Sequence, residues 1–284
     1  MPEVAGVKHR MVDVGGLSLH VAEAGSGEPV VLLHGWPENW YLWRTVMPAL
    51  AANYHVYAPD LRGFGWSEAP REGYQKEQFA TDMLSLLDEL NLGPVRLVGH
   101  DWGGFTGFLM CLREPDRFQA YLALNITTPW INRAAALRNL HRSWYQLFMA
   151  SGLGGRVFQA RPPWLNAVMR RAAVNPAAWS SADMDVYLDR LCQPERAHAS
   201  VQVYRELLLR EGPAWLAGRY DEHRLEVPTL MLFGEADLAV TPSMLMGFED
   251  HADDMRLELV PGVGHFIVDE RPDLVVEAAL RLFA

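Results

Sequence analysis

The sequence has little of what builds disulfide frameworks, metal sites or membrane-spanning chains. Its 284 residues include only two cysteines, Cys111 and Cys192, whose spacing fits neither a metal site nor a set of bridges. We expect both to be packing residues. Residues 1–10 are interrupted by charged side chains where a signal peptide has an apolar core, and no later apolar run is long enough to span a membrane. We therefore expect a cytoplasmic protein.

Basic runs, internal repeats and low-complexity tracts are also missing. The formal net charge is −10, which argues against a nucleic-acid partner and against an anionic membrane surface. Half of the residues are hydrophobic. A chain of this length can therefore fill the core of one α/β domain with an insertion, or of two domains.

The most informative stretch is a short apolar run that ends in a glycine-flanked turn. Residues 95–98 have the length and β-branched content of a buried strand, and Asp101 follows between Gly99 and Gly103, where a Cβ atom would crowd the turn. The turn lacks the spacing of a dinucleotide-binding fingerprint and the Lys-Ser/Thr of a P-loop. It resembles the nucleophile elbow of the α/β-hydrolase fold, with Asp where esterases carry Ser. An Asp here also suits a helix N-cap. The next apolar residues recur at helical spacing, namely Phe105, Phe108, Leu109 and Leu112.

Other apolar segments predict the rest of a sheet. Residues 11–14 and 17–21 alternate around two glycines, which indicates an antiparallel hairpin. The helical spacing of residues 79–90 predicts a helix before the elbow strand, and a last helix is expected from Pro272 to the end. Residues 30–33 form an unbroken apolar run, which is typical of a parallel strand buried on both faces. Further strands are predicted at 55–58, 121–124, 229–233 and 256–260.

The strand pattern stops between residues 127 and 213. Helical patterns rich in Arg and Trp replace it, and strands resume at residue 229. The sequence therefore predicts an α/β protein: an α/β-hydrolase fold with a mostly parallel, doubly wound sheet and an inserted helical cap. The predicted core domain comprises residues 1–126 and 214–284, and the predicted cap domain comprises residues 127–213.

Each of the last two predicted strands leads into a loop with a titratable residue. Asp237 follows the first strand and His265 follows the second. Both loops leave the same edge of the sheet as Asp101, which is where ligands bind in open α/β sheets. Alone, such a histidine is more often a hydrogen-bonded core residue and such an aspartate a loop cap. The chain order nucleophile, acid, histidine is that of α/β-hydrolases, so we predict a triad of Asp101, Asp237 and His265.

Four motifs lie along the core segments. They are His34-Gly35-Trp36-Pro37-Glu38, Asp60-Leu61-Arg62-Gly63-Phe64-Gly65-Trp66-Ser67, Gly99-His100-Asp101-Trp102-Gly103-Gly104 and Gly262-Val263-Gly264-His265-Phe266. Together they resemble an epoxide hydrolase of the α/β-hydrolase superfamily, over essentially the whole chain, although dehalogenases share part of the set. The resemblance implies an oxyanion hole made by the backbone amides of Trp36 and Trp102, and a cis bond before Pro37. It also implies that Glu38 orients the hydrolytic water, while a carboxylate at a helix start has an equally good structural explanation.

The chemistry of a carboxylate nucleophile explains why Asp suits the elbow. Attack on an ester carbonyl would give a mixed anhydride, whereas attack on a saturated carbon leaves an ordinary alkyl ester. Water activated by His265, whose ring Asp237 orients, can then hydrolyse the ester on Asp101. The predicted function is the opening of an epoxide to a vicinal diol, and a serine-type esterase is not expected.

An epoxide leaves an alkoxide, which needs a proton donor, and the tyrosine phenol suits this task. Epoxide hydrolases of this type place two cap tyrosines over the nucleophile. Tyr145 and Tyr204, in Ser143-Trp144-Tyr145-Gln146 and Val203-Tyr204-Arg205, resemble these two motifs. We predict both as donors and, with Trp36 and Trp102, as substrate-binding residues. Either tyrosine could instead be a packing residue on a cap helix.

Two other interpretations remain open. A haloalkane dehalogenase would hold the halide with Trp102 and a cap tryptophan such as Trp144, Trp164 or Trp179, because position 36, where many of these enzymes carry Asn, is Trp. Fluoroacetate dehalogenases carry arginines around the elbow, and here that segment is apolar. A non-catalytic receptor with this fold would bind a small molecule without turnover, and it would need no intact triad.

The sequence implies no metal and no organic cofactor, since it has no ligand spacing and no cofactor fingerprint. The expected partner is a small apolar epoxide, with no nucleic acid and no membrane. The sequence leaves open which epoxide is bound, with what selectivity, and whether copies of the chain form a homo-oligomer.

Overall fold

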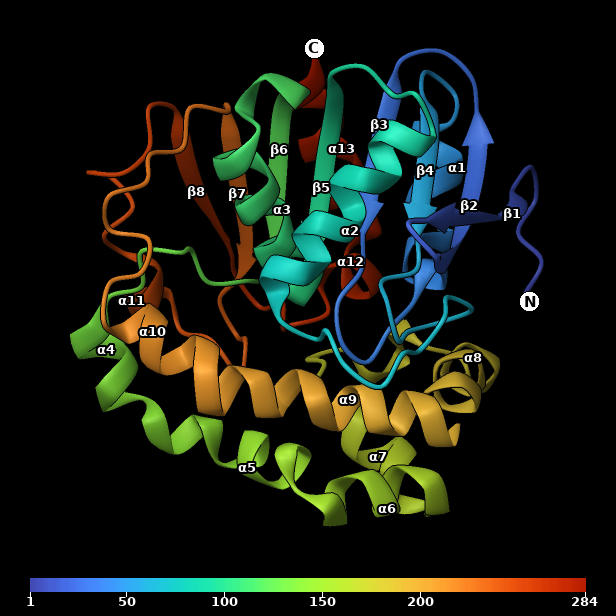
Figure 1. Cartoon of the computed structure of the whole chain (residues 1–284), viewed down its shortest axis with the longest axis vertical. Helices are drawn as coiled ribbons and strands as arrows, with labels where there is room; N and C mark the ends of the chain where they lie inside the picture. The colour runs from blue at the N-terminus through green and yellow to red at the C-terminus, as the bar shows by residue number, and fades with distance from the viewer.

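The computed structural model describes residues 1–284 apart from the side chain of Val168 and has one eight-stranded sheet between helical layers (Figure 1). The strand order is β1-β2-β4-β3-β5-β6-β7-β8, and only β2 runs antiparallel to its neighbours. The predicted α/β-hydrolase sheet is thus confirmed. The strands are β1 (Lys8–Val14), β2 (Leu17–Gly25), β3 (Pro29–Leu33), β4 (His55–Pro59), β5 (Val95–His100), β6 (Phe118–Leu124), β7 (Thr229–Gly234) and β8 (Met255–Val260).

The predicted hairpin at the N-terminal edge is also present. Gly15 and Gly16 connect β1 and β2 with φ angles of 61° and 91°, in the left-handed region that two-residue hairpin turns require. Val14 pairs with Leu17 across this turn. Most of β1 is exposed, as expected for an edge strand.

Successive residues of the central strands enter opposite hydrophobic cores. In β3, Val31 and Leu33 belong to the core beneath α2 (Lys76–Glu89) and α3 (Asp101–Arg113). Val30 and Leu32 belong to the core on the other face, which contains side chains of α1 (Val46–Leu50), α12 (Ile267–Glu270) and α13 (Pro272–Phe283). Figure 1 shows α2 and α3 in front of the sheet and α13 behind it. Burial on both faces explains the continuous apolar runs of these strands.

Helices occupy the described chain between β6 and β7, and Figure 1 shows them across one end of the sheet. In that view α9 lies nearest the sheet, with α5 and α6 beyond it. The predicted boundary at 213/214 falls inside α10, so the division into core and cap stays a prediction. The helices are α4 (Arg133–Arg138), α5 (Trp144–Ala150), α6 (Gly152–Ala160), α7 (Trp164–Arg170), α8 (Ser181–Leu191), α9 (Pro194–Glu206), a π-helical turn (Leu207–Glu211) and α10 (Gly212–Leu216).

Several short elements were not predicted from periodicity. They include α1, α12, α11 (Pro242–Leu245) and the 3-10 turns Trp40–Arg44, Pro115–Arg117, Leu140–Ser143 and Pro176–Ala178, all of them too short for a periodic signal. The helix α3 begins at Asp101 itself, earlier than its apolar spacing indicated. Among the described residues, no helix combines the length and apolar character needed to cross a bilayer.

Candidate active site

The turn between β5 and α3 holds Asp101 in a backbone conformation that most residues avoid. Its φ angle is +51°, in the left-handed region. A Cβ atom added to Gly99 would lie 2.7 Å from the carbonyl oxygen of Gly103, and one added to Gly103 would lie 2.3 Å from that of His34. A Cβ atom on Gly35 would lie 2.3 Å from Oδ1 of Asp101. Three glycines therefore let the backbone close tightly around one carboxylate.

Asp237 and His265 lie beside this carboxylate. His265 Nδ1 is 2.7 Å from Oδ2 of Asp237, and His265 Nε2 is 3.5 Å from Oδ2 of Asp101. Burial lowers the pKa of His265, but the charge of Asp237 and the contacts with both carboxylates outweigh it, so the pKa lies well above 6.5. The resting site thus contains an imidazolium between two carboxylates.

Asp237 is held by a residue that the sequence analysis missed. Asn125, directly after β6, donates its side-chain N–H to Oδ2 of Asp237 at 2.9 Å and accepts the Gly234 N–H at 3.1 Å. Asn125 has a φ angle of +41° and is fully buried. The amides of Ala239 and Val240 donate to Oδ1 of Asp237. The sequence offers one signal for this role: Asn125 is a polar residue directly after a predicted strand, and that strand ends at the sheet edge that carries the triad.

The predicted oxyanion-hole residues lie around the elbow. The backbone amide of Trp36 donates to Oδ1 of Asp101 at 2.8 Å. Trp102 is in the first turn of α3, where backbone amides have no acceptor within the helix. The bond between Trp36 and Pro37 is cis, as the resemblance implied. The Trp36 amide is therefore in contact with the Asp101 carboxyl group, and the role of the Trp102 amide stays a prediction.

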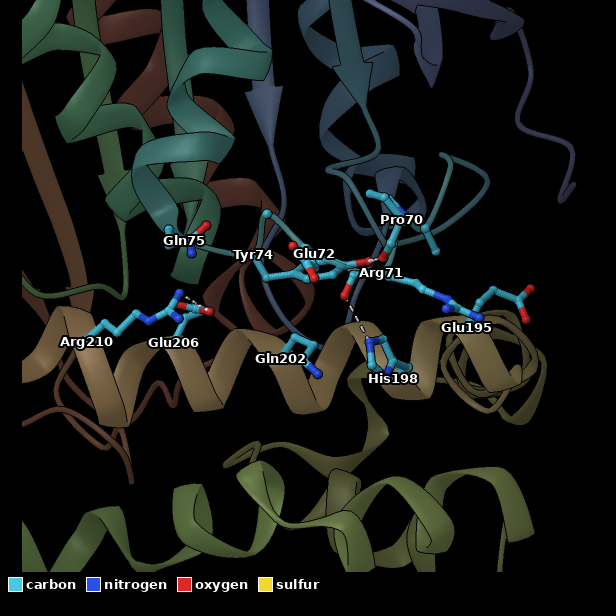
Figure 2. Close-up of a pocket in the computed structure, with 12 residues that line it drawn as sticks. Pro70, Arg71, Glu72, Tyr74, Gln75, Glu195, His198, Gln202, Glu206 and Arg210 are labelled. Atoms are coloured by element: carbon cyan, nitrogen blue, oxygen red, sulfur yellow. Dashed lines mark hydrogen bonds and ion pairs between the residues drawn. The ribbon is translucent and has the colours of Figure 1, made fainter.

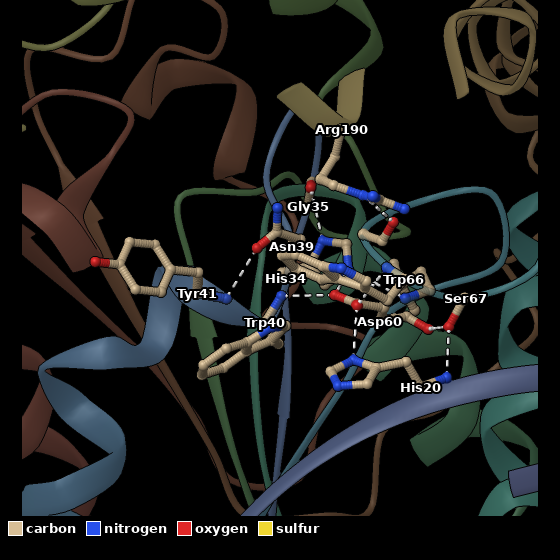
Figure 3. A network of polar contacts seen from close by, with 12 residues as sticks. His20, His34, Gly35, Asn39, Trp40, Tyr41, Asp60, Trp66, Ser67 and Arg190 are labelled. Carbon is tan, nitrogen blue, oxygen red and sulfur yellow. Dashed lines mark hydrogen bonds and ion pairs between the residues drawn. The ribbon is translucent and has the colours of Figure 1, made fainter. Parts of the chain in front are cut away.

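A buried network around Asp60 fixes the segment that carries Trp36 (Figure 3). Asp60 accepts hydrogen bonds from the backbone amides of Trp40 and Trp66 at 2.7 and 2.8 Å, and from the ring of His20 at 2.8 Å. Burial raises the pKa of Asp60, but the hydrogen bond and charge of His20 act more strongly with the other donors, so the net shift is downward. An ionised Asp60 thus anchors the two loops that follow β3 and β4.

Glu38 and His100 form a second buried pair, directly behind His265. His100 Nε2 is 2.9 Å from the backbone oxygen of His265, and His100 Nδ1 is 3.0 Å from Oε2 of Glu38. Because Nε2 must donate to a carbonyl, we assign Nδ1 as the acceptor and the proton to Glu38. Burial raises the pKa of Glu38 to about 8 and lowers that of His100 to about 4, in agreement with this assignment.

The Glu38 carboxyl group also lies next to that of Asp269, and Asp269 is connected through Arg44 to the cap. Burial beside the acidic group of Glu38, with which Asp269 competes for a proton, raises the pKa of Asp269 to about 8. Arg44 donates to Oδ1 of Asp269 at 2.6 Å and lies 3.3 Å from Asp183 on α8. The buried carboxyl pair therefore connects the backbone of His265 to a cap helix.

We expect stability to fall as the pH rises, because of this carboxyl pair. Both groups have pKa values of about 8 in the folded protein, above the ordinary 4.5 of Glu38 and 3.8 of Asp269. Between these values and pH 8 the native state retains protons that the unfolded chain has lost. Urea midpoints should therefore decrease from pH 6 to pH 9, and the Glu38→Gln variant should show a smaller decrease. The exposed Glu226→Gln variant is the control, and an unchanged pH dependence in Glu38→Gln would contradict the assignment.

The two predicted cap tyrosines lie together in the interior. The ring of Tyr204 on α9 is 6.3 Å from that of Tyr145 on α5, 5.6 Å from Trp36 and 6.3 Å from Trp102. Burial raises the pKa of Tyr145 to about 12 and that of Tyr204 well above 10, and the charge of Asp101 adds to both shifts. Both phenols are therefore neutral at ordinary pH and electrostatically coupled to Asp101.

Lys76 is a further residue that sequence reasoning missed. It is 1% exposed at the start of α2, and its Nζ donates to Glu211 at 2.6 Å and to the backbone oxygen of Val203 at 3.1 Å. The same ammonium group lies 4.4 Å from the ring centre of Trp102. It thus joins the core to the helix that carries Tyr204.

The cap tryptophans considered as halide donors have different positions. Trp144 and Trp164 are 69% and 49% exposed, so much of each side chain faces solvent. Trp179 is buried, its ring lies 4.8 Å from that of Phe266, and its indole N–H has no hydrogen-bond partner among the described residues. Of the three, only Trp179 has the burial expected of an internal halide donor.

A large groove on the described surface lies away from the triad (Figure 2). It measures about 1060 Å³ and separates the 69–75 loop from α9. Its walls are mainly polar, and His198 bridges it with a contact of 3.1 Å to the backbone oxygen of Arg71. None of the predicted site residues lines it, so we assign it no part in catalysis. Within the described chain, no group of three or more His, Cys, Asp or Glu side chains is arranged to hold a metal ion.

Comparisons with known proteins identify the family of this chain and several similar proteins. Residues 28–272 match the family model of the alpha/beta hydrolase fold. The chain is 31% identical to a soluble epoxide hydrolase of Corynebacterium sp. (strain C12), over 98% of both chains. It is 30% identical to a fluoroacetate dehalogenase of a Burkholderia species, over 94% of this chain and 91% of that protein. The crystal structure of Cfl2 from Burkholderia cenocepacia superimposes with a TM-score of 0.88 at 29% identity, covering 100% of this chain and 98% of that chain.

Proposed function

The chain belongs to the α/β-hydrolase family, and from this premise we propose that it is an epoxide hydrolase that works through an alkyl ester on Asp101. The observation that carries the proposal is an aspartate at the elbow, in place of a serine, with two neutral tyrosines coupled to it, Tyr204 buried and Tyr145 partly buried. The carboxylate suits attack on a saturated carbon, and the phenols suit protonation of the oxygen that leaves it. The similarity to a soluble epoxide hydrolase supports the same conclusion.

In the first step, the Asp101 carboxylate forms a bond to an epoxide carbon, and the carbon–oxygen bond of the ring breaks. The electron pair passes to the ring oxygen, which takes a proton from Tyr145 or Tyr204. The tyrosinate then regains a proton from His265, whose raised pKa keeps it protonated in the resting site. The step ends with a hydroxyalkyl ester on Asp101 and a neutral imidazole.

In the second step, His265 acts as a base. Ester formation removes the negative charge of Asp101, which is one of the groups that raise the pKa of His265, so the pKa falls and the neutral ring can accept a proton. It takes a proton from water, and the oxygen attacks the ester carbonyl of Asp101. The amides of Trp36 and Trp102 stabilise the oxyanion, and Asp237 stabilises the imidazolium. The tetrahedral intermediate then breaks its bond to the substrate oxygen, and this oxygen takes the proton of the new carboxyl group. The diol leaves, with Asp101 again a carboxylate and His265 again protonated. A water-orienting role of Glu38 stays a prediction.

A dehalogenase is the second candidate, because a fluoroacetate dehalogenase is similar over nearly the whole chain. The buried Trp179 indole is the observation in its favour. Incubation with styrene oxide and, separately, with a 1-haloalkane separates the two proposals. We expect diol without free halide. Free halide without diol would reject the epoxide hydrolase, and tight binding of an epoxide without any product would favour the non-catalytic receptor.

The tyrosines should control epoxide opening. We expect Tyr145→Phe and Tyr204→Phe each to lower kcat/KM for styrene oxide by about 10²-fold or more, because each removes a donor to the developing oxide. Stopped-flow quenching of tryptophan fluorescence would locate the loss in ester formation. Tyr187→Phe is the matched control, since this buried cap hydroxyl lies 3.2 Å from Arg44. Unchanged kinetics in both test variants would assign the donor role elsewhere.

A further inference from the structure

The cap exposes a set of large apolar side chains to solvent. Four of them recur at intervals of three, four and three residues along α4, the 3-10 turn after it and α5, which is the spacing of one helical side. Figure 1 shows α5 and α6 along the border of the molecule farthest from the sheet, and α4 at one side, next to α10 and α11. The exposed fractions are 61% for Leu137, 62% for Leu140, 69% for Trp144, 66% for Leu147 and 60% for Leu153 on α6.

The first part of the cap, which includes α4 to α7, has a positive net charge, whereas the whole chain has a negative one. Between residues 127 and 182 the sequence contains seven arginines and neither Asp nor Glu, although the chain as a whole has a net charge of −10. Apart from the adjacent pair Arg170 and Arg171, the arginines are separated by at least three residues, so they form no long basic run in the sequence. The expectation that excluded an anionic membrane surface rested on the net charge and did not detect this segregation.

Two of these arginines are available to bind an external anion. Arg138 and Arg156 are exposed, and in the described structure neither is paired with a carboxylate. Arg161, by contrast, lies 2.8 Å from Asp185. Arg138 follows Leu137 directly, and Arg156 is one helical turn from Leu153. We call Leu137, Leu140, Trp144, Leu147 and Leu153, with Arg138 and Arg156, the outer cap face.

We propose that the outer cap face binds the surface of a bilayer that contains anionic lipid. Exposed Trp and Leu side chains enter the boundary between headgroups and acyl chains, while arginines beside them attract anionic headgroups. A nucleic acid would use the arginines but not five exposed apolar side chains. A symmetric dimer through this face would bring the arginines of two copies together. The inference does not depend on the proposed function, because neither observation involves the triad.

Vesicle sedimentation tests the proposal. The full chain is mixed with vesicles of phosphatidylcholine alone or of equal parts phosphatidylcholine and phosphatidylglycerol, at low and high salt. We expect binding to the anionic vesicles that weakens at high salt. The Trp144→Ser/Leu147→Ser variant should bind at least about tenfold more weakly, and Arg138→Gln/Arg156→Gln should lose about fivefold for each arginine.

A matched control and two alternative assays complete the design. Leu259→Ser/Arg256→Gln changes an exposed apolar residue and an exposed arginine on β8 and should bind as the unmodified chain does. Circular dichroism melting checks that each variant folds. The proposal is overturned if anionic vesicles do not bind the chain at low salt, or if Trp144→Ser/Leu147→Ser binds equally well. It is also overturned if these substitutions dissolve a dimer in sedimentation equilibrium, or if single-stranded RNA binds while vesicles do not.

Discussion

The Asp101→Asn variant is expected to turn over epoxides at least about 10⁴-fold more slowly than the unmodified enzyme. A neutral amide oxygen is a poor nucleophile, so no ester forms and the later steps have no substrate. The substitution keeps the shape of the side chain in a turn closed by three glycines, and the Trp36 amide can still donate to the retained oxygen. The fold should therefore survive while the chemistry stops.

Initial rates of diol formation from styrene oxide provide the measurement. The introduced amide can deamidate back to a carboxylate, so intact-protein mass spectrometry must accompany each assay. Asp116→Asn, at an exposed position beyond α3, is the matched control and should keep full activity. Substantial activity in protein that peptide mapping shows to retain the introduced amide would remove Asp101 from the nucleophile role.

The His265→Gln variant should stop after the first step. Asp101 can still attack the epoxide, but no base takes the proton from the hydrolytic water, and we expect ester hydrolysis to slow by about 10²- to 10⁴-fold. His265 is the ring that touches both carboxylates, at 2.7 and 3.5 Å. Its loss should therefore allow one turnover and leave the enzyme trapped as an ester.

Intact-protein mass spectrometry after mixing with styrene oxide should show an increase equal to the mass of one epoxide. Proteolysis should then place the label on the peptide that contains Asp101. His251→Gln is a control, because that ring stacks on Trp130, outside the triad. A label on any other residue, or steady multiple turnover without a label, would contradict the two-step mechanism.

The strands and the elbow could be predicted because their signals are local. Residues 95–98 are apolar except for Arg96, and Gly99 and Gly103 leave room that the observed turn needs, since a Cβ atom at either position would lie less than 3 Å from other backbone atoms. Neither signal depends on distant residues. The short helices α1 and α12 gave no such signal, since four or five residues are too few to show a period.

The residues that support the site could not be recognised in the same way. Asn125 looks like any residue after a strand, and only its contacts with Asp237 and Gly234 give it a role. Glu38 and Asp269 are 231 positions apart in the sequence, yet burial next to one another raises the pKa of each to about 8. In the sequence, Lys76 resembles an ordinary solvent-exposed helix residue. Only the folded structure shows that the cap buries it.

The sequence by itself determined the succession of strands along the chain, the turn that presents Asp101 and the chain order of Asp101, Asp237 and His265. Backbone sterics and side-chain periodicity act over a few residues, so they are readable along the chain. The tertiary structure alone decided which cap side chains face inward, because Tyr145 and Trp144 are neighbours in the sequence but differ in exposure. It also decided which of the cap arginines are paired with carboxylates and which, such as Arg138 and Arg156, face solvent without one in the described structure. Burial and charge are properties of packed surfaces, and distant segments must meet before either exists.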